Sequence, residues 1–444
     1  MSRIASVIRR ALEATTADDL KRRGSPTWLA GRKGEWGSRT GLVNVETRHH
    51  APTDEAPMTL AIHAASAQMG GAMTYLRNIL PLMAGSAASQ NASRILLWAQ
   101  HELQSVVDSP AIDRRDPGGA SDTSTPLGIG RRIWFDQSSL PKQLRAERVD
   151  VLFSSANFGV LRCPVPQVLL VCNTIYFEPR FTERMRSPLL RLRTMAERQL
   201  VIASIRAADV VLFPSRAMMD LTAVATGGPR PTWHVAPFGA QPGLFSPRCG
   251  PRSFSSPTRV LHVSHYSEQK NIGTLLRAMT SLEQRSRGRY FLQLTAGMAE
   301  RRPGARLPSL SEDVALYRQL ERRGAALDLG QRSYGALPDL YRSADVFVFP
   351  SYTESFGFPL VEAMSSGVPI VAADVPIHRE MCGEAAVYFP AFDAEACARA
   401  IERVANDAEL SAQMRDRGLR RAGEFTWSRH VESLWDAVRE ARSS

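Results

Sequence analysis

The sequence lacks any apolar run long enough to cross a bilayer, and its amino terminus lacks the apolar core of a signal peptide. A membrane-spanning helix needs about 20 consecutive apolar residues, and a secretion signal carries an apolar stretch of roughly 7–15 residues. We therefore expect a cytoplasmic protein.

Patterns for disulfides and metal ions are also missing. The five cysteines are odd in number and include no Cys-x-x-Cys pair, and the nine histidines include no His-Glu-x-x-His arrangement. No Asp-x-Asp pair occurs in the chain either. We expect reduced thiols, no zinc site and no other metal site.

Lysine is scarce, although Lys and Arg together number 55 and the net charge is +11. Lys270 is the only lysine after Lys142, and an ammonium does not substitute freely for an arginine at a phosphate. The positive charge would suit nucleic acid, an anionic membrane face or diphosphate ligands. Because the sequence has no RNP, zinc-finger or helix-turn-helix pattern, we do not expect nucleic acid as a partner.

Short apolar runs alternate with helical stretches from Met58 onward, which predicts an α/β protein with parallel sheets covered by helices. A length of 444 residues and a hydrophobic content of 44% allow two domains. A segment rich in Gly, Ser, Pro and Asp, residues 113–128, is expected to be a flexible loop. We expect helices over 72–83 and 183–206, and strands over residues 58–64, 94–99, 149–154, 167–172, 210–213, 233–237, 259–264, 346–349 and 368–373.

The chain is expected to divide into domains at its composition changes. Residues 1–57 form an amino-terminal extension that is either disordered or a short basic amphipathic, membrane-associating segment. Residues 58–245 and 258–424 form two Rossmann-like domains, joined by a Pro- and Ser-rich linker at 246–257. Residues 425–444 form a last helix with one apolar stripe, made of Trp427, His430, Val431, Leu434, Trp435 and Val438.

The stretch 346–373 predicts a strand, a polar loop, a helix and a second strand. Pro350 ends the first strand, Pro359 suits the first turn of the helix, and Gly367 suits its carboxyl end. Glu354 lies in the loop and Glu362 in the helix. A helix amino terminus attracts phosphate, and carboxylates beside it can hold sugar hydroxyls, so the unit suits a sugar joined to a phosphate. The alternative is a pair of solvated glutamates on an ordinary α/β unit.

The detailed pattern decides between these interpretations. Glu354 and Glu362 are separated by seven residues, with Phe356-Gly357 between them and Ala363-Met364 after the second. This resembles the Glu-x7-Glu signature of family-4 glycosyltransferases, and the preceding segments 337–341 and 343–345 resemble the same family. The resemblance implies a GT-B fold, in which two Rossmann-like domains face each other across a cleft and the last helix crosses back to the amino-terminal domain. Residues 58–245 would then form the acceptor domain and residues 258–424 the nucleotide-sugar donor domain. It also implies that a sugar is transferred from a nucleotide-sugar co-substrate with retention of its anomeric configuration, and that no other cofactor is needed.

The resemblance also implies roles for particular residues. Glu354, with the Phe356-Gly357 backbone, would meet the donor sugar, Glu362 would bind the ribose, and Lys270 would neutralise the diphosphate. Glu354 and Lys270 are therefore the expected catalytic residues, and Asn271 is expected to cap the helix that Lys270 precedes. The expected donor-binding set is Gly70, Gly71, His265, Lys270, Asn271, Glu354, Ser355, Phe356, Gly357, Phe358, Leu360 and Glu362.

Two positions depart from the family pattern. His265 stands where the family usually has an arginine, and Cys172 stands where it often has a sugar-pocket histidine. Cys172 and Asn173 remain candidate sugar-pocket residues, although for Cys172 we favour a buried small residue.

The sequence thus predicts a retaining hexosyltransferase that uses GDP-mannose or a UDP-sugar. The expected acceptor is a saccharide or lipid-linked acceptor of bacterial surface polysaccharide biosynthesis, with the enzyme bound peripherally to the anionic inner face of the inner membrane. The alternatives are a nucleotide-sugar epimerase on the same fold, and a non-catalytic glycosyltransferase-like scaffold, which the changes at His265 and Cys172 motivate.

Overall fold

The computed structural model describes residues 56–65, 71–99, 109–118, 126–185, 187–241, 243–247, 256–298 and 310–444. The chain divides into two units, Met1–Pro57 and Met58–Ser444. The expected amino-terminal segment 1–57 lies almost wholly outside the described residues, as do Gly70 and most of the expected linker. Within the part of the chain that is described, no helix is both long and apolar enough to pass through a membrane.

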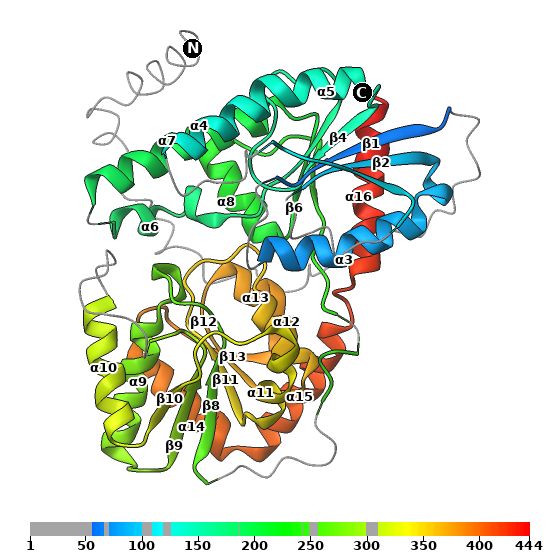
Figure 1. Cartoon of the computed structure of the whole chain (residues 1–444). Helices are drawn as coiled ribbons and strands as arrows, with labels where there is room; N and C mark the ends of the chain where they lie inside the picture. The colour runs from blue at the N-terminus through cyan, green and yellow to red at the C-terminus, as the bar shows by residue number, and fades with distance from the viewer. Residues whose placement is uncertain are drawn as a thin grey trace. The chain divides into compact units, whose positions relative to one another are not determined.

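The first half of the second unit forms a parallel sheet in the order β3-β2-β1-β4-β5-β6-β7 (Figure 1). The fully buried strands β4, β5 and β6 are mostly apolar, with Ser154 and Gln167 as their polar residues, as expected for strands covered on both faces. The described strands are β1 (Met58–His63), β2 (Ala92–Trp98), β3 (Ile112–Arg115), β4 (Val151–Ser154), β5 (Gln167–Leu170), β6 (Val210–Phe213) and β7 (Trp233–Val235).

A second parallel sheet follows, in the order β10-β9-β8-β11-β12-β13. In both sheets the order reverses beside the first strand, between β1 and β4 and between β8 and β11. Ligands of open α/β sheets bind at such switch points, outside the carboxyl ends of the strands. The strands are β8 (Thr258–His262), β9 (Tyr290–Leu294), β10 (Ala326–Asp328), β11 (Val346–Phe349), β12 (Ile370–Ala373) and β13 (Ala386–Phe389).

Helices connect the strands and cover the sheets (Figure 1). Those of the first half are α3 (Gly71–Ser86), η2 (Ala88–Gln90), α4 (Pro126–Trp134), η4 (Phe135–Ser139), α5 (Leu140–Ala146), η5 (Thr174–Tyr176), α6 (Pro179–Glu183), α7 (Pro188–Ala207) and α8 (Arg216–Thr226). Those of the second half are η6 (Glu268–Lys270), α9 (Ile272–Arg285), α10 (Leu310–Arg322), η7 (Tyr334–Ala336), α11 (Leu337–Ser343), α12 (Phe358–Ser365), α13 (Pro376–Cys382), η8 (Gly383–Ala385), α14 (Ala394–Asn406) and α15 (Ala408–Ala422).

The last helix, α16 (Trp427–Arg442), returns to the first sheet, as expected for a GT-B fold. It lies against α3 and β6 (Figure 1), and every residue of the predicted apolar stripe is buried. Polar atoms fix its register: His430 Nδ1 donates to the carbonyl of Ala236 at 3.0 Å, and Trp435 Nε1 donates to Ser86 Oγ at 2.9 Å. The α/β class and the crossover helix are therefore confirmed.

Two local predictions are wrong. The segment expected to be a flexible loop from residue 113 begins inside β3, because parallel pairing with β2 and an ion pair between Arg94 and Asp113 order this polar strand. The helix expected over 183–206 is present as α7, but its predicted start is wrong, because Ser187 caps a helix whose first residue is Pro188 and Glu183 ends the separate short helix α6. The nine predicted strands are present, with ends within two residues of the expected positions.

Candidate functional site

The candidate site is formed by two loops at the carboxyl ends of neighbouring strands of the second sheet. One loop follows β8 and leads to Lys270, and the other follows β11 and carries Glu354. The loops are tied together because Tyr352 N donates to Gln269 O at 3.0 Å and Asn271 Nδ2 donates to Pro350 O at 3.0 Å. This edge is the switch point of the sheet, where a ligand of this fold class binds.

Lys270 and Glu354 form an ion pair across these loops. Lys270 Nζ donates to Glu354 Oε1 at 2.6 Å, and the side chains are 11% and 14% exposed. The ammonium also lies 5.7 Å from the centre of the Phe349 ring, within reach of a cation–π contact. The sequence assigned these residues to different parts of a ligand, and the structure brings them into direct contact.

Two buried histidines flank Phe349 beside this pair. His262 Nδ1 lies 3.0 Å from Val348 O, and His378 Nδ1 lies 2.9 Å from Ala373 O. Because a carbonyl only accepts, each Nδ1 carries a proton. Burial lowers the pKa of both histidines to about 4, so both rings are neutral near pH 7. Sequence reasoning missed both residues: His262 lies inside the predicted strand 259–264, and His378 lies five residues after the end of the predicted strand 368–373.

Several buried polar atoms around these loops have no hydrogen-bond partner. Burying a polar atom without a partner costs free energy, so such atoms call for an explanation. Of the nine such side-chain atoms among the described residues, four belong to segments that follow β8, β11 and β12: Ser267 Oγ, Ser351 Oγ, Tyr352 Oη and His378 Nε2. Their concentration at this edge fits a site for a polar ligand.

Glu362 lies on α12 and is 4% exposed. Tyr341 Oη donates to its Oε2 at 2.9 Å. Burial raises the pKa of Glu362 to about 7, and hydrogen bonds from Tyr341 and Tyr334 oppose the rise. The simple alternative of a solvated glutamate is wrong, whereas ribose binding by Glu362 stays a prediction.

The Ser355–Phe358 segment turns into α12 through a glycine with a positive φ. Gly357 has φ +84°, and a Cβ there would lie 3.2 Å from Leu360 Cδ1, so a larger residue would be strained. Phe356 and Phe358 pack with Phe238 at ring distances of 5.4 Å. Their side chains therefore serve packing, and a ligand would meet this segment through its backbone. Leu360 is fully buried.

Other predicted residues lie nearby in the fold. Gly71 opens α3, and a Cβ there would lie 3.9 Å from a ring atom of Phe358. His265 is exposed on the loop after β8. Asn271 occupies the N-cap position of α9, but the predicted cap is wrong in detail: its side chain bonds Thr274 Oγ1 at 2.9 Å and Pro350 O instead of a helix amide.

Cys172 and Asn173 follow β5 in the first sheet. Their backbone amides both donate to Asn157 Oδ1, at 2.9 and 3.0 Å, and Asn173 Oδ1 accepts from Ile175 N at 3.2 Å. Burial raises the pKa of the Cys172 thiol to about 12, so it is a neutral group. These contacts fit a structural role for Cys172, as favoured from the sequence.

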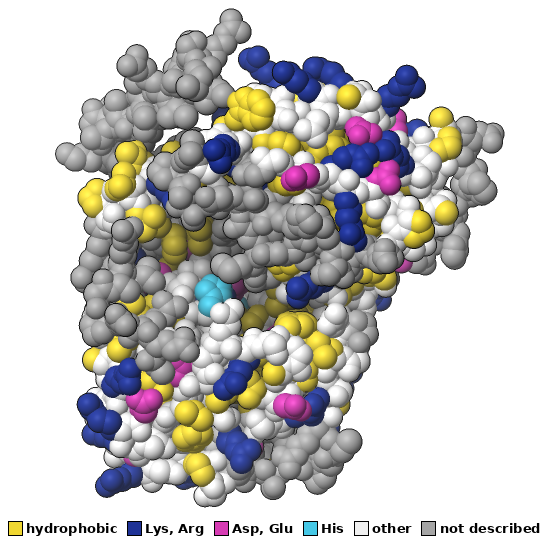
Figure 2. Space-filling model, in the orientation of Figure 1, with side chains coloured by type: hydrophobic (Ala, Val, Ile, Leu, Met, Phe, Trp, Pro, Cys, Tyr) yellow, Lys and Arg dark blue, Asp and Glu magenta, His cyan; other side chains and the backbone are white. Residues whose placement is uncertain are grey.

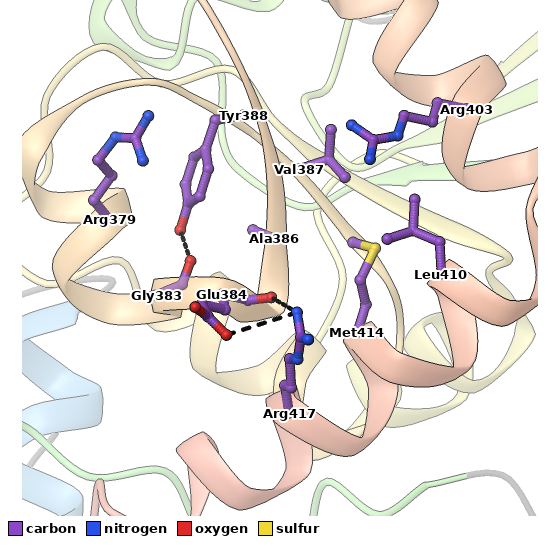
Figure 3. A pocket seen from close by; sticks show the side chains of 10 residues that line it. All are labelled: Arg379, Gly383, Glu384, Ala386, Val387, Tyr388, Arg403, Leu410, Met414 and Arg417. Atoms are coloured by element: carbon purple, nitrogen blue, oxygen red, sulfur yellow. Dashed lines mark hydrogen bonds and ion pairs between the residues drawn. The ribbon is translucent and has the colours of Figure 1, made fainter. Parts of the chain in front are cut away.

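A separate hollow of about 540 Å³ lies over β13, α13, α14 and α15 (Figure 3). None of the predicted site residues lines it. Two of its three arginines are paired: Arg417 pairs with Glu384, and Arg379 pairs with Asp374 and lies 4.6 Å from the Tyr388 ring centre. Across the described residues, no group of three or more His, Cys, Asp or Glu side chains is placed to hold a metal ion.

Comparison with known proteins decides the family. Residues 251–421, which carry the Lys270–Glu354 pair and Glu362, match the family model for glycosyl transferases group 1. This part of the chain is a glycosyl transferases group 1 domain. The predicted family is confirmed.

Curated relatives match over part of the chain. The chain is 33% identical over 170 residues to O-antigen chain mannosyltransferase B of Escherichia coli, covering 38% of this chain and 42% of that protein. It is 39% identical over 110 residues to D-inositol 3-phosphate glycosyltransferase of Salinispora tropica, covering 24% and 22% of the two chains. The similarity thus spans less than half of the length of these relatives.

Solved structures match over most of the chain and confirm the GT-B fold. Sucrose-phosphate synthase of Thermosynechococcus elongatus superposes with a TM-score of 0.65 at 18% identity, covering 86% of this chain and 98% of that one. WaaG, a glycosyltransferase involved in lipopolysaccharide biosynthesis, superposes with a TM-score of 0.62 at 15% identity, covering 85% and 99%. At these identities the likeness shows the fold of the glycosyl transferases group 1 domain and its partner sheet.

Proposed function

We propose that this protein is a retaining glycosyltransferase that moves a hexose from a nucleoside diphosphate sugar to an acceptor hydroxyl. The observation that carries the proposal is the Lys270–Glu354 ion pair at the switch point of the second sheet, inside the family domain. The Lys270 ammonium suits a diphosphate, and the Glu354 carboxylate suits sugar hydroxyls.

Lys270 and Glu354 would divide the donor between them. A bound diphosphate competes with Glu354 for the Lys270 ammonium, a compact charge with three donors. The Glu354 carboxylate is then free to accept hydrogen bonds from sugar hydroxyls. The backbone of Phe356-Gly357 lies next in the chain, and Gly357 begins α12, whose first N–H groups suit an anion.

The transfer step would follow a front-face route. The bond between the anomeric carbon and the diphosphate oxygen breaks, and the acceptor oxygen bonds to the same face of that carbon. The acceptor proton passes to the leaving diphosphate oxygen, so the step needs no enzymic base. Lys270 and helix N–H groups would stabilise the charge that develops on the diphosphate, without a required metal.

The remaining predicted residues would complete the donor site. Glu362 would bind the ribose through a carboxylate that also accepts from Tyr341 and Tyr334. Gly70, Gly71, His265, Asn271, Ser355, Phe358 and Leu360 would shape the donor pocket through backbone approach and packing, with His265 as a weaker donor than the arginine of the family pattern.

The donor and acceptor are proposed from the relatives. GDP-mannose or a UDP-sugar fits the mannosyltransferase relative and the Anabaena HepE structures, which were solved with UDP and UDP-glucose. A saccharide or lipid-linked acceptor of bacterial surface polysaccharide biosynthesis fits the O-antigen and lipopolysaccharide enzymes among the relatives. The protein would then work in the cytoplasm, at the inner face of the inner membrane.

Basic side chains of the described residues are spread over the visible face in Figure 2 instead of forming one patch. Attachment to anionic lipid is proposed for residues 1–57, because their first residues carry a basic amphipathic pattern. Binding of the full chain to anionic vesicles should fall as salt rises and should drop when residues 1–57 are deleted. Equal binding to neutral vesicles would contradict the proposal.

A panel of nucleoside diphosphate sugars tests the function. The matching donor should raise the melting temperature and, with saccharide acceptors, should yield a product with retained anomeric configuration. Interconversion of the donor without an acceptor would instead indicate an epimerase. Nucleotide binding without turnover on any acceptor would indicate a scaffold.

A further inference from the structure

The amino terminus of α8, in the first half of the molecule, is held by the second half. Ser215 is the N-cap of α8 and is fully buried. Its Oγ accepts from Met218 N at 3.1 Å, as an ordinary cap does, and donates to Ser355 O at 2.7 Å. Ser355 follows Glu354 directly, so the cap of α8 contacts the loop that carries the proposed catalytic carboxylate.

A second group on α13 binds the same helix end. Glu380 Oε1 accepts from Arg216 N and Oε2 accepts from Ala217 N, both at 2.7 Å. These amides belong to the first turn of α8, which has no partners within the helix, and the carboxylate complements the helix dipole. The amino terminus of α8 is therefore capped twice, once by Ser215 and once by the Glu380 carboxylate, which belongs to the second half of the molecule.

The segment that presents Glu380 is itself tied to the crossover into α16. Arg421 on α15 donates to Glu380 O at 2.7 Å and to Met381 O at 3.1 Å, and it lies 5.0 Å from the Phe425 ring centre. Phe425 O accepts from Ala240 N at 3.1 Å, where the chain leaves the first sheet. The chain passes between the two halves near Ala240 and again near Phe425. A continuous set of contacts thus runs from these two crossings to the amino terminus of α8.

We propose that Ser215 and Glu380 are positioning residues that hold the Glu354 loop against the first half of the molecule during transfer. Breaking their contacts would leave each half folded and the nucleotide site intact, because neither residue lies among the proposed nucleotide-binding groups. The donor sugar and the acceptor would then lose their fixed relation, and a small misplacement of reacting groups is costly. This inference rests on the proposed glycosyl transfer.

Substitutions with matched controls test the proposal in the full chain. Ser215→Gly removes the bond to Ser355 while glycine remains an acceptable N-cap, costing only a few tenths of a kcal/mol. Ser187→Gly is its control, since Ser187 is an exposed N-cap that accepts from Leu190 N of its own helix, α7. Glu380→Gln leaves one acceptor for two amides, and Asp393→Asn, at the cap of α14, is its control.

The first readout separates kcat from nucleotide binding. Ser215→Gly and Glu380→Gln should each lower kcat by roughly five- to tenfold, the effect of about one hydrogen bond. The dissociation constant of the nucleoside diphosphate should stay within about twofold, and both controls should keep the wild-type kcat. An unchanged kcat, an equal loss in the controls, or a parallel loss of nucleotide affinity would each overturn the proposal.

The second readout does not depend on activity. Hydrogen exchange at the amides of Arg216 and Ala217 should become at least about tenfold faster in Glu380→Gln than in the wild type. Unchanged exchange would show that Glu380 does not bind α8 in solution and would overturn the proposal. If the wild-type protein transferred no sugar, the proposed function would fail. The exchange measurement would still test the contact between Glu380 and the first turn of α8.

Discussion

At the scale of single residues, the proposed chemistry depends on the state of Glu354. Its carboxylate accepts a hydrogen bond from the Lys270 ammonium at 2.6 Å, and a bound diphosphate that competes for this ammonium would free the carboxylate for sugar hydroxyls. If it holds the donor sugar more tightly in the transition state than in the ground state, Glu354→Ala should lower kcat by about 10² with little change in nucleotide affinity. Steady-state kinetics and calorimetry measure both quantities.

The control for this variant is Glu312→Ala, which removes an exposed glutamate from an ion pair with Arg277 in the same half of the molecule. It should leave kcat unchanged, because exposed pairs contribute little. Near-normal turnover in Glu354→Ala would remove Glu354 from the proposed site.

Glu362 predicts a dependence of stability on pH. Burial raises its pKa from 4.5 to about 7, so the folded state holds this proton more tightly than the unfolded state does. Stability should therefore fall as pH rises from about 4.5 to 7, by up to about 3 kcal/mol from this group. Thermal unfolding of the wild type and Glu362→Gln across this range should differ in slope, with the variant less dependent on pH. Parallel pH profiles would contradict the assignment of the raised pKa.

At the scale of elements, the two chain crossings between the halves lie in backbone contact. Ala240 pairs with Thr426 as an isolated bridge, and a Cβ on Gly239 would lie 2.1 Å from Trp427 N. Since backbone cannot move away easily, Gly239→Ala should destabilise the protein by about 3 kcal/mol or more. Gly335→Ala is the control, because a Cβ there meets nothing within 4 Å. Equal melting temperatures for the two variants would contradict this account.

The elements were predictable where one residue pattern determines them. The runs Val210–Phe213 and Val346–Phe349 have the predicted bounds because buried parallel strands are continuous apolar runs. The break before α7 and strand β3 were not recognised, since the first rests on a single capping serine and the second on pairing with a distant neighbour. Tertiary pairing overrides local composition at such positions.

The site was only partly predictable for the same reason. Spacing along the chain identified Glu354, Glu362 and Lys270 as candidates. It could not show that Lys270 and Glu354 form an ion pair, because that contact joins loops after two different strands. Nor could it show that Ser215 and Glu380 meet at α8, since their contact depends on how the two sheets are connected through the crossover.

At the scale of the whole molecule, the predicted transfer works without a metal ion. The chain has no Asp-x-Asp pair to chelate a cation against a diphosphate, and we propose that Lys270 supplies the positive charge in its place. Saturating EDTA should therefore leave the transfer rate essentially unchanged. Loss of activity with EDTA and its recovery with manganese or magnesium would contradict this part of the mechanism.

The central claim is that Lys270 binds the diphosphate of a nucleotide sugar. Calorimetry of one nucleoside and its diphosphate, with the wild type, Lys270→Ala and the exposed control Lys142→Ala, tests it most directly. Lys270→Ala should weaken diphosphate binding by roughly 1.5–3 kcal/mol, the value of a charge-assisted contact, and should leave nucleoside binding almost unchanged. Lys142→Ala should bind both ligands as the wild type does. An equal loss for nucleoside and diphosphate in Lys270→Ala would contradict the account.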